Sequence, residues 1–535
     1  MRKLLAITAL ILTTTITISG QGVVDALNNI SSQTKGTARY SAMAGAFGAL
    51  GGDLTSIRQN PAGIGVYRSS EISVTAGFNF YDNRTSSPMY DNRNSDFYFT
   101  GDNMGVVGTI NFKEGALRNL NFGFAYNNVA SYNNVYRADW DNISSSLTQL
   151  IASKTSSLNC PPGDLGITSS YNPYNNMPWL SVLGYNTNLI HQAQGVGSQN
   201  MYLPIFDSKQ SHGNAYLINV TSGDVEEYDF NVSGNIYDVF YWGLSVNVTN
   251  IYYHQESYYG EELQDITVSN NHENRTKTSL TNGNFELSNY LLTKGLGAGA
   301  KLGFIYRPVN FLRIGAAVHT PTFYDMSDVY SAAVGYKFDK VDGQTLVGSE
   351  NSIDNQTDIG QIDYQFTSPW HVMGSLAIIF NKWGIISADY EYTFANEMYY
   401  SDLYSDYSYV NRCINNEVSG VHNVRIGAEW RITPLFSARA GYAYESSPLD
   451  NNYFTGASTP LLAEGTICHY QVPGDVHNIT CGLGYRFNNF SIDAAYVFRT
   501  QDYSIFAFEG MATGRENTIL NMNNHSIKVT LGLRF

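Results

Sequence analysis

The stretch "HSIKVTLGLRF", His525 to Phe535, alternates between apolar and polar side chains along its whole length. One face of an extended chain then carries Ile527, Val529, Leu531, Leu533 and Phe535. The other face carries Lys528, Thr530, Gly532 and Arg534. A period of two, with one apolar and one polar face, is typical of a half-buried β-strand. We therefore predict that the chain ends in such a strand.

The same alternation recurs upstream in pairs of segments that tight turns connect. "HNITCGLGYRF" turns through Asn488-Asn489 into "FSIDAAYVFR", and "NVRIGAEWRI" turns through Thr433-Pro434 into "FSARAGYAYE". Counting from "SEISVTAGFNFY", we predict fourteen strands whose connections alternate between short turns and long polar loops. This pattern is typical of an antiparallel transmembrane β-barrel with its turns in the periplasm. A soluble β-sandwich is the alternative, but its outward residues would be polar.

The first twenty residues indicate an exported protein. Arg2 and Lys3 precede the apolar run Leu4–Ile18, which ends in Ser19 and Gly20. This is the pattern of a secretory signal peptide, and the run is shorter than the ~20 residues of a membrane-spanning helix. No cysteine follows Gly20 to accept a lipid. We predict a signal peptide over 1–20, a small N-terminal unit over 21–70, and an outer-membrane barrel over 71–535.

Composition and motifs exclude several function classes. Without Arg2 and Lys3, 29 basic residues face 46 acidic ones, so the mature chain carries a formal charge of −17, which disfavours nucleic acid as a partner. "GLGAGA", Gly295 to Ala300, has dinucleotide-binding spacing but lacks the strand-to-helix context. No G-x-S-x-G occurs. We expect neither an enzyme nor a cofactor.

The four cysteines permit disulfides without specifying them. Cys468 and Cys481 are close enough in sequence to join across a loop, whereas Cys160 and Cys413 stand far from any other cysteine. None has C-x-x-C spacing, so we expect no metal site.

Charged and histidine residues have fixed phases in the predicted strands. The face opposite the apolar one, which is the lumen in a barrel, carries residues of both signs, and we predict a structural salt-bridge lattice of Asp389, Glu391, Arg425, Glu429, Arg439, Glu445, Arg486, Asp493 and Lys528. Three strands begin with a histidine in phase with the lipid face: His422, His477 and His525. We expect these histidines beside lipid headgroups.

Two long insertions interrupt the strand pattern. The first runs from about 137 to 213 and contains a possible amphipathic helix, "ISSSLTQLIAS"; the second runs from about 255 to 289. Both are expected on the extracellular side, where loops of this size serve as lids or binding surfaces.

Residues 21–70 do not alternate and are rich in glycine and alanine. In "GGDLTSIRQNPAGIGVY", Asp53 can cap a short helix that starts at Leu54, and Pro61 disfavours helical geometry at Asn60. We predict a plug folded back into the lumen, with a gate-like turn at Asn60, Pro61, Ala62 and Gly63. Residues predicted to line a pathway are Met43, Phe47, Gly295, Gly297 and Gly299.

This stretch resembles the N-terminal hatch of the FadL/TodX-type outer-membrane transporters for long-chain fatty acids and other hydrophobic compounds. The matching residues are Gly36, Ala38, Ala42, Met43, Gly45, Ala46, Phe47, Ala49, Asp53 and Asn60 to Gly63. "LRIGAAVHTPT", "VRIGAEWRITPLFSARAGYAYESSP" and "GLGYRFNNFSIDAAYVF" are similar in the distal half.

The resemblance implies passive transport. Extracellular loops would capture a hydrophobic molecule, which would pass to a pocket above the hatch and leave sideways into the membrane. Asn60, Pro61 and Ala62 would lie beside a distorted early strand where the wall opens. Outer-membrane lipid and the barrel-assembly machinery are the other implied partners.

Two other functions remain open. A surface binding protein, for haem for instance, is suggested by tyrosine-rich loops and by His191, His212, His254, His272 and His469. A porin for polar solutes would need an open lumen.

Overall fold

The computed structural model describes residues 22–535 except 88, 169, 194–199, 272–277, 353–354, 382, 404, 450–465 and 510–517. The predicted signal peptide lies outside the described residues. Among the residues described, no helix is both long and apolar enough to cross a membrane.

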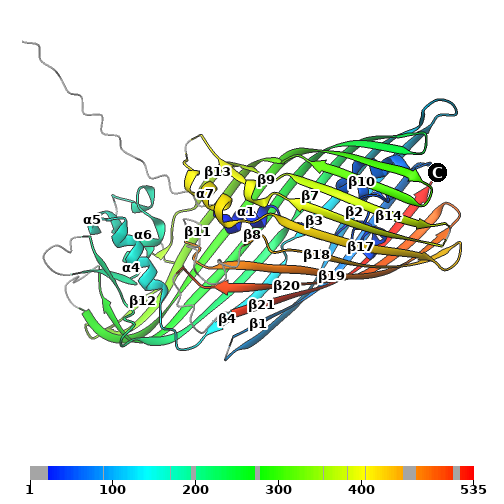
Figure 1. Ribbon diagram of the computed structural model, residues 1–535. Helices are drawn as coiled ribbons and strands as arrows, with labels where there is room; N and C mark the ends of the chain where they lie inside the picture. Colours follow the sequence, from blue (N-terminus) through cyan, green and yellow to red (C-terminus); the bar gives the residue numbers. More distant parts are fainter. Residues whose placement is uncertain are drawn as a thin grey trace, which may run out of the picture.

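Strands dominate the chain (Figure 1). They are β1 (Glu71–Ser86), β2 (Asp91–Asn111), β3 (Leu117–Ser131), β4 (Asn134–Trp140), β5 (Ile190–Gln192), β6 (Tyr202–Pro204), β7 (His212–Ile236), β8 (Phe240–Ser269), β9 (Thr278–Val309), β10 (Leu312–His319), β11 (Phe323–Val341), β12 (Gln344–Gly348), β13 (Gly360–Thr367), β14 (His371–Phe380), β15 (Gly384–Thr393), β16 (Tyr399–Ser401), β17 (Val421–Arg431), β18 (Phe436–Glu445), β19 (Tyr470–Phe487), β20 (Phe490–Phe506) and β21 (Thr518–Arg534).

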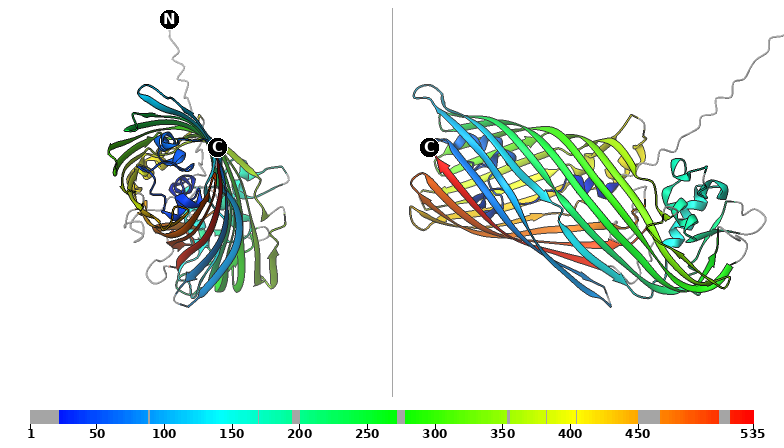
Figure 2. Two further views of the ribbon diagram at one scale, coloured as in Figure 1. Left: turned by 90° about the vertical axis from the view of Figure 1, so that its right-hand side faces the viewer. Right: turned by 180° about the vertical axis from the view of Figure 1, so that it is seen from behind.

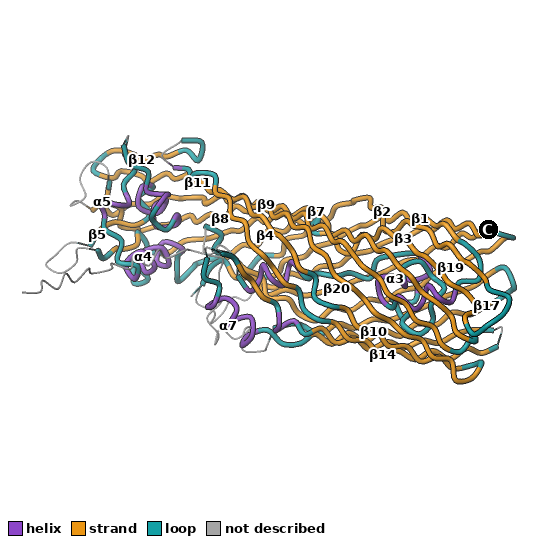
Figure 3. The backbone as a smooth tube through the Cα atoms, turned by 90° about the horizontal axis from the view of Figure 1, so that it is seen from above, coloured by secondary structure: helices purple, strands orange, loops and turns teal. Residues whose placement is uncertain are grey.

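The helices are short and are not part of the barrel wall. They are α1 (Val23–Asn29), α2 (Ala38–Ala42), α3 (Ser56–Gln59), η1 (Pro61–Val66), α4 (Leu147–Ser157), α5 (Pro162–Leu165), η2 (Pro173–Asn175), α6 (Trp179–Asn186), η4 (Ala395–Glu397) and α7 (Ser408–Glu417). Figure 3 shows α4 and α5 at the end of the molecule opposite the C-terminus, and α3 among the strands near that terminus.

The sheet closes into a barrel because β1 pairs with β2 on one side and with β21 on the other, from Glu71↔Arg534 to Ser86↔Ile519. Four strands are interrupted and run as β3–β4, β10–β11, β13–β14 and β15–β16, while β12 only extends the edge beside β11. Counted this way, the barrel has the fourteen antiparallel strands that the alternation predicts.

The apolar face of each strand points outward. On β21, Ile527 and Leu531 are exposed, whereas Lys528 and Thr530 are buried in the lumen. From His477 to Phe487, β19 rises about 33 Å, which at a tilt of ~40° spans roughly 25 Å, the height of an outer-membrane apolar band. The protein is an outer-membrane β-barrel.

Only one of the two predicted insertions is a separate unit. Residues 141–211 hold α4 to α6, β5 and β6, and α4 confirms the helix expected there. The second prediction is wrong, because β8 continues to Ser269 and β9 starts at Thr278. Above the apolar band the outward residues of a strand can be polar, so the alternation that marks a strand is lost although the ladder continues.

The N-terminal segment, residues 22–70, lies inside the barrel, as the view from the C-terminal end shows (Figure 2). The short helix predicted before Asn60 is α3, but it begins at Ser56 and not at Leu54, and its N-cap is Thr55. Asp53 Oδ1 accepts a hydrogen bond from the Thr55 amide at 2.9 Å in the turn before the helix. Asn60 is extended, with φ −132° and ψ 103°, as expected before Pro61.

The structure does not join Cys468 to Cys481. Both thiols are free; Cys468 is buried before β19, and Cys481 lies eleven residues beyond the start of that strand on its exposed face. Eleven strand residues span roughly 35 Å, far more than the ~7 Å that a disulfide allows between Cα atoms.

Candidate functional site

Glycines of the barrel wall receive the turn at Asn60. A Cβ on Gly303 of β9 would lie 2.0 Å from Asn60 Oδ1, and a Cβ on Gly243 of β8 would lie 2.3 Å from the Pro61 carbonyl carbon. The turn therefore touches the backbone of the wall directly. Ala62 packs with Tyr241 and Ile305 of the same two strands.

Hydrogen bonds fix the same turn. Asn60 Nδ2 donates to the Gly48 carbonyl at 2.6 Å and to the Phe304 carbonyl at 3.2 Å, and Asn60 Oδ1 accepts from the Ala62 amide at 3.1 Å. Gly63 O accepts from the Gly52 amide at 2.9 Å. Asn60 and Pro61 thus lie against β8 and β9, not beside an opening in an early strand. The turn has the contacts of an anchor.

Met43 and Phe47 are also fully buried, in contact with wall strands and with the rest of the N-terminal segment. The Met43 backbone faces Gly427 of β17 and Gly441 of β18, whose added Cβ atoms would each lie 2.5 Å from it. Phe47 packs on Tyr40, with ring centroids 5.5 Å apart, and under the Arg39 guanidinium. The glycines of the wall strands were the sequence signal for these contacts. The alternation within single strands did not show that they face the N-terminal segment.

Gly295, Gly297 and Gly299 face the lumen but do not meet the N-terminal segment. Side chains from Thr322 to Met326 fill the space above them: Met326 lies over Gly295, Tyr324 over Gly297, and Thr322 over Gly299. These glycines leave room for side chains of the neighbouring wall segment.

The wall itself parts between β2 and β3. Their ladder runs from Asn111↔Asn119 to Asn103↔Asn127 and stops there, although both strands are fully described beyond that point. β2 skips Asp102 in its pairing with β1, and β3 skips Val129 in its pairing with β7, so each strand carries a bulge at this level. The two strands then follow different neighbours.

The parting lies within the apolar band. Phe78 of β1 pairs with Phe99 of β2 and with Ile527 of β21, and all three side chains are exposed on the outer face. An opening at this height would lead from the lumen into the membrane.

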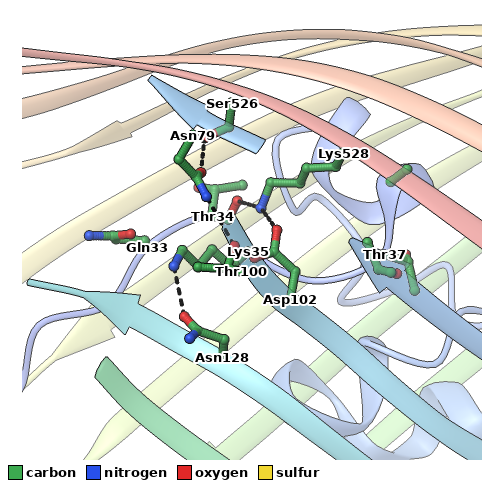
Figure 4. A network of polar contacts seen from close by, with 12 residues as sticks. Gln33, Thr34, Lys35, Thr37, Asn79, Thr100, Asp102, Asn128, Ser526 and Lys528 are labelled. Atoms are coloured by element: carbon green, nitrogen blue, oxygen red, sulfur yellow. Dashed lines mark hydrogen bonds and ion pairs between the residues drawn. The ribbon is translucent and has the colours of Figure 1, made fainter. Parts of the chain in front are cut away.

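Residues 33–35 of the N-terminal segment cover the parting from inside (Figure 4). The Gln33 amide donates to the Val129 carbonyl at 3.0 Å. Lys35 Nζ donates to Asn128 Oδ1 at 2.7 Å and to Ser131 Oγ at 2.6 Å, both on β3. We call Gln33 to Lys35 the latch.

The other side of the parting holds the latch by charge. Lys528 Nζ of β21 lies 2.8 Å from Asp102 Oδ2 of β2 and donates to the Thr34 carbonyl at 3.3 Å. Thr100 Oγ1 donates to the second oxygen of Asp102 at 2.6 Å. Lys35, Asp102 and Lys528 are all buried. Because buried charges are stable only when they are paired and hydrogen-bonded, these contacts hold the latch in place.

Sequence reasoning placed Lys528 in the lumen but missed Lys35. Lys35 is the single lysine between residues 22 and 70, which was the available signal. The predicted salt-bridge lattice is present in part: Arg425 Nη1 lies 2.7 Å from Glu391 Oε2, and Arg439 bridges Glu429 and Asp493 at 2.7 and 2.6 Å. Asp389 instead accepts from the Gly48 amide and Gln59, Glu445 accepts from Asn423, and Arg486 is exposed. Arg39 of the N-terminal segment joins it at 2.9 Å from Glu429.

Two lumenal cavities lie beside residues 29–33, with volumes of about 280 and 140 Å³. His371, Glu391 and Arg425 line both of them. His319 Nε2 lies 2.8 Å from the Gln59 carbonyl and its ring is 5.8 Å from that of His371.

The histidines behind the haem alternative lie in separate places. His191 is buried in β5, His212 begins β7, His254 packs on Tyr290, and His469 lies 3.0 Å from Gln255; His272 is outside the described residues. The three strand-starting histidines do lie on the outer face, each within 2.8 Å of a tyrosine hydroxyl: His422, His477 and His525.

No family model and no curated protein sequence matches this chain. Among solved structures, the crystal structure of a Pseudomonas aeruginosa FadL homologue aligns over 94% of this chain and 99% of its own, at a TM-score of 0.52 and 12% identity. The chain has a FadL-type fold. The Pseudomonas putida toluene transporter TodX aligns over the same shares at 0.46 and 12%, and the Ralstonia pickettii toluene transporter TbuX at 0.42 and 14%. At these identities, the FadL-type likeness is one of fold.

Proposed function

We propose that this protein is a passive outer-membrane channel for hydrophobic molecules, which leave the lumen sideways between β2 and β3. The observation that carries the proposal is the parting of these strands inside the apolar band, which the latch covers from inside. The FadL-type fold and the named cargo of similarly folded channels, toluene for TodX, support the same class of function.

In this proposal the N-terminal segment is a plug with a fixed part and a moving part. The turn from Asn60 to Gly63, pressed on wall glycines, is the fixed anchor. The latch is the moving part, since it is held mainly by polar side chains that can exchange partners. Long-chain fatty acids are the cargo that the sequence resemblance suggests, and we propose them as substrates.

A polar-solute porin is the less favoured function. The N-terminal segment contacts opposite walls, β3 through the hydrogen bonds of Lys35 and β17 and β18 through Met43, so it crosses the lumen. A porin of this kind would conduct sugars freely, and liposome swelling in arabinose would reveal it.

Uptake of radiolabelled oleate and toluene by a host lacking its own transporters tests the proposal. We expect uptake above the empty-vector level, and no gain with either compound, at normal surface expression, would contradict it. Lys35→Ala should change the rate of uptake. Lys294→Ala is the matched control. Lys294 is exposed on the outer face of β9, so this substitution removes the same charge far from the parting.

A further inference from the structure

The two cavities in the lumen carry charged side chains. The cavity of about 280 Å³ has mixed walls, with Glu391, Arg425, Glu445 and Arg499 beside apolar residues that include Val24, Leu27 and Ile30, and the one of about 140 Å³ is lined by Arg58 and Lys301 among others. A hydrophobic molecule placed against these charges would remove water from them and offer no hydrogen bonds in return, which costs several kcal/mol. The charged parts of these cavities therefore do not suit the cargo of the proposed function.

α1 fills an apolar space in the lumen. Val23 and Ala26 of α1 are fully buried in an apolar cluster whose other members come from barrel strands and from α7 and the segments beside it. The wall residues that surround α1 come from eight strands, and most of the large ones are aromatic: Tyr324, Tyr364, Phe366, Tyr400, Tyr470 and Phe506. Phe366 and Tyr400 lie 5.1 Å apart between ring centroids, and Tyr470 stacks on Phe506 at 4.8 Å. We call this space the aromatic chamber.

Few polar contacts hold α1 in the chamber. Tyr132 Oη donates to the Asn28 carbonyl at 2.8 Å, and Tyr400 Oη donates to the Gly22 carbonyl at 3.5 Å. The Asp25 carboxylate accepts only from the Gly22 amide, within its own turn. A helix of seven residues is marginal by itself. Its position thus depends on apolar contacts, which another apolar body could replace.

Asp25 makes this docking less favourable. Burial raises the pKa of the Asp25 carboxyl to about 7, and the nearby Asp328 adds to the rise. The other titratable groups that face it are tyrosines of three strands: Tyr253, Tyr364 and Tyr400. Arg425 and Arg499 line the same cavity as Asp25, but neither forms an ion pair with it in the described structure. The chamber therefore tolerates a carboxyl group only at a cost.

We propose that α1 occupies the ligand-binding chamber of this channel, and that the ligand which displaces it is a rigid, mostly apolar polycyclic molecule with hydrogen-bond acceptors. The inference rests on the proposed function and, for this chamber, replaces the fatty acid suggested there by a polycyclic cargo. A helix of seven residues is about 10 Å long and roughly 10 Å across. One alkyl chain in that volume would leave voids, whereas fused rings would fill it and stack on the tyrosines and phenylalanines.

The two tyrosine hydroxyls define the polar part of this ligand. They now donate to carbonyls at the two ends of α1, Asn28 and Gly22. When α1 leaves, each hydroxyl loses its acceptor inside a buried site, which is unfavourable unless the ligand supplies one. An oxygen atom at one end of the ring system, as in 1-hydroxypyrene, satisfies one of them, and a second oxygen at the other end would satisfy both.

Fluorescence titration of the purified full-length barrel with 1-hydroxypyrene tests the proposal, with hexadecan-1-ol as the straight-chain competitor. Ala26→Asp places a charge in the apolar contact of α1 without touching the wall. It should tighten the apparent Kd for 1-hydroxypyrene about tenfold or more, because the competing helix is released. Phe366→Ala, added to Ala26→Asp, should weaken it again by about tenfold.

Unchanged affinity in Ala26→Asp, in a barrel whose circular dichroism is intact, would overturn the proposal. So would displacement of 1-hydroxypyrene by equimolar hexadecan-1-ol. Hydrogen exchange of residues 22–30 gives a second measurement, since bound 1-hydroxypyrene should remove their protection. If 1-hydroxypyrene binds as expected but neither oleate nor toluene is taken up, the chamber stands and the transport proposal fails. Uptake without any binding of 1-hydroxypyrene would overturn the chamber and leave the transport proposal standing.

Discussion

Lys35→Ala should open the parting between β2 and β3. The substitution removes two hydrogen bonds from a buried ammonium group, at 2.7 Å to Asn128 and 2.6 Å to Ser131. Hydrogen bonds to a charged group contribute about 1.5–3 kcal/mol each. Even at the low end, the closed form loses about 3 kcal/mol, so the open population rises roughly a hundredfold.

Double electron–electron resonance measures this opening directly. Spin labels at Phe99→Cys on β2 and Tyr126→Cys on β3 flank the parting on the outer face, after the four native cysteines are replaced by alanine. We expect a second, longer distance in Lys35→Ala. A label pair at Val74 and Leu531, which are paired across the intact ladder of β1 and β21, is the matched control and should not change.

The reasoning fails if both label pairs give the same distances in Lys35→Ala as in the parent and uptake is also unchanged. In that case Lys35 only fills space, and the bulges at Asp102 and Val129 are features of the wall without a role in transport.

Three further perturbations have defined outcomes. Gly303→Val should push the Asn60 turn off β9 and expose it to limited proteolysis, whereas Gly374→Val, whose added Cβ meets no atom within 4 Å, should not. Docking of α1 should weaken as the pH rises from about 4 to 7 and stay constant above 7, since the pKa of Asp25 is about 7 when α1 is docked and 3.8 ordinarily. Hydrogen-exchange protection of residues 22–30, corrected for intrinsic rates, measures this pH dependence, and Asp25→Asn should abolish it. Glu261→Ala should lower the melting temperature, because Glu261 caps α4 by accepting hydrogen bonds from the Leu147 amide and from the hydroxyls of Ser146 and Tyr259. Loss of these bonds costs about 3 kcal/mol of stability, and an unchanged melting curve would contradict the prediction.

The strand count was predictable from sequence because the membrane acts on each strand separately. A residue such as Ile527 must be apolar to face lipid, and Lys528 must then face the lumen, so the pattern needs no knowledge of the rest of the fold. Beyond the apolar band the membrane no longer imposes this alternation, so the strands there could not be predicted. Above the apolar band, β8 carries Glu256 and Glu262 among tyrosines, and the strand continues there without the alternation.

The latch was not predictable because it depends on residues far apart in the chain. Lys35 meets Asn128 and Ser131 about a hundred positions later, and Lys528 reaches Thr34 from the last strand. The sequence showed a compact turn at Asn60 and a plug around it, which favoured that turn as the gate. Its local geometry was predicted correctly, but its neighbours were set by glycines on β8 and β9.

The glycines that receive the N-terminal segment also set the order in which the molecule must be built. Met43 docks on Gly427 and Gly441, which follow it by nearly four hundred residues. A chain exported from its N-terminus therefore delivers this segment to the periplasm long before its docking surface exists. Long apolar side chains exposed for that interval would invite aggregation. Because glycine, alanine and serine are frequent in this segment, it exposes less apolar surface while it is unfolded, so its composition serves biogenesis as well as close packing.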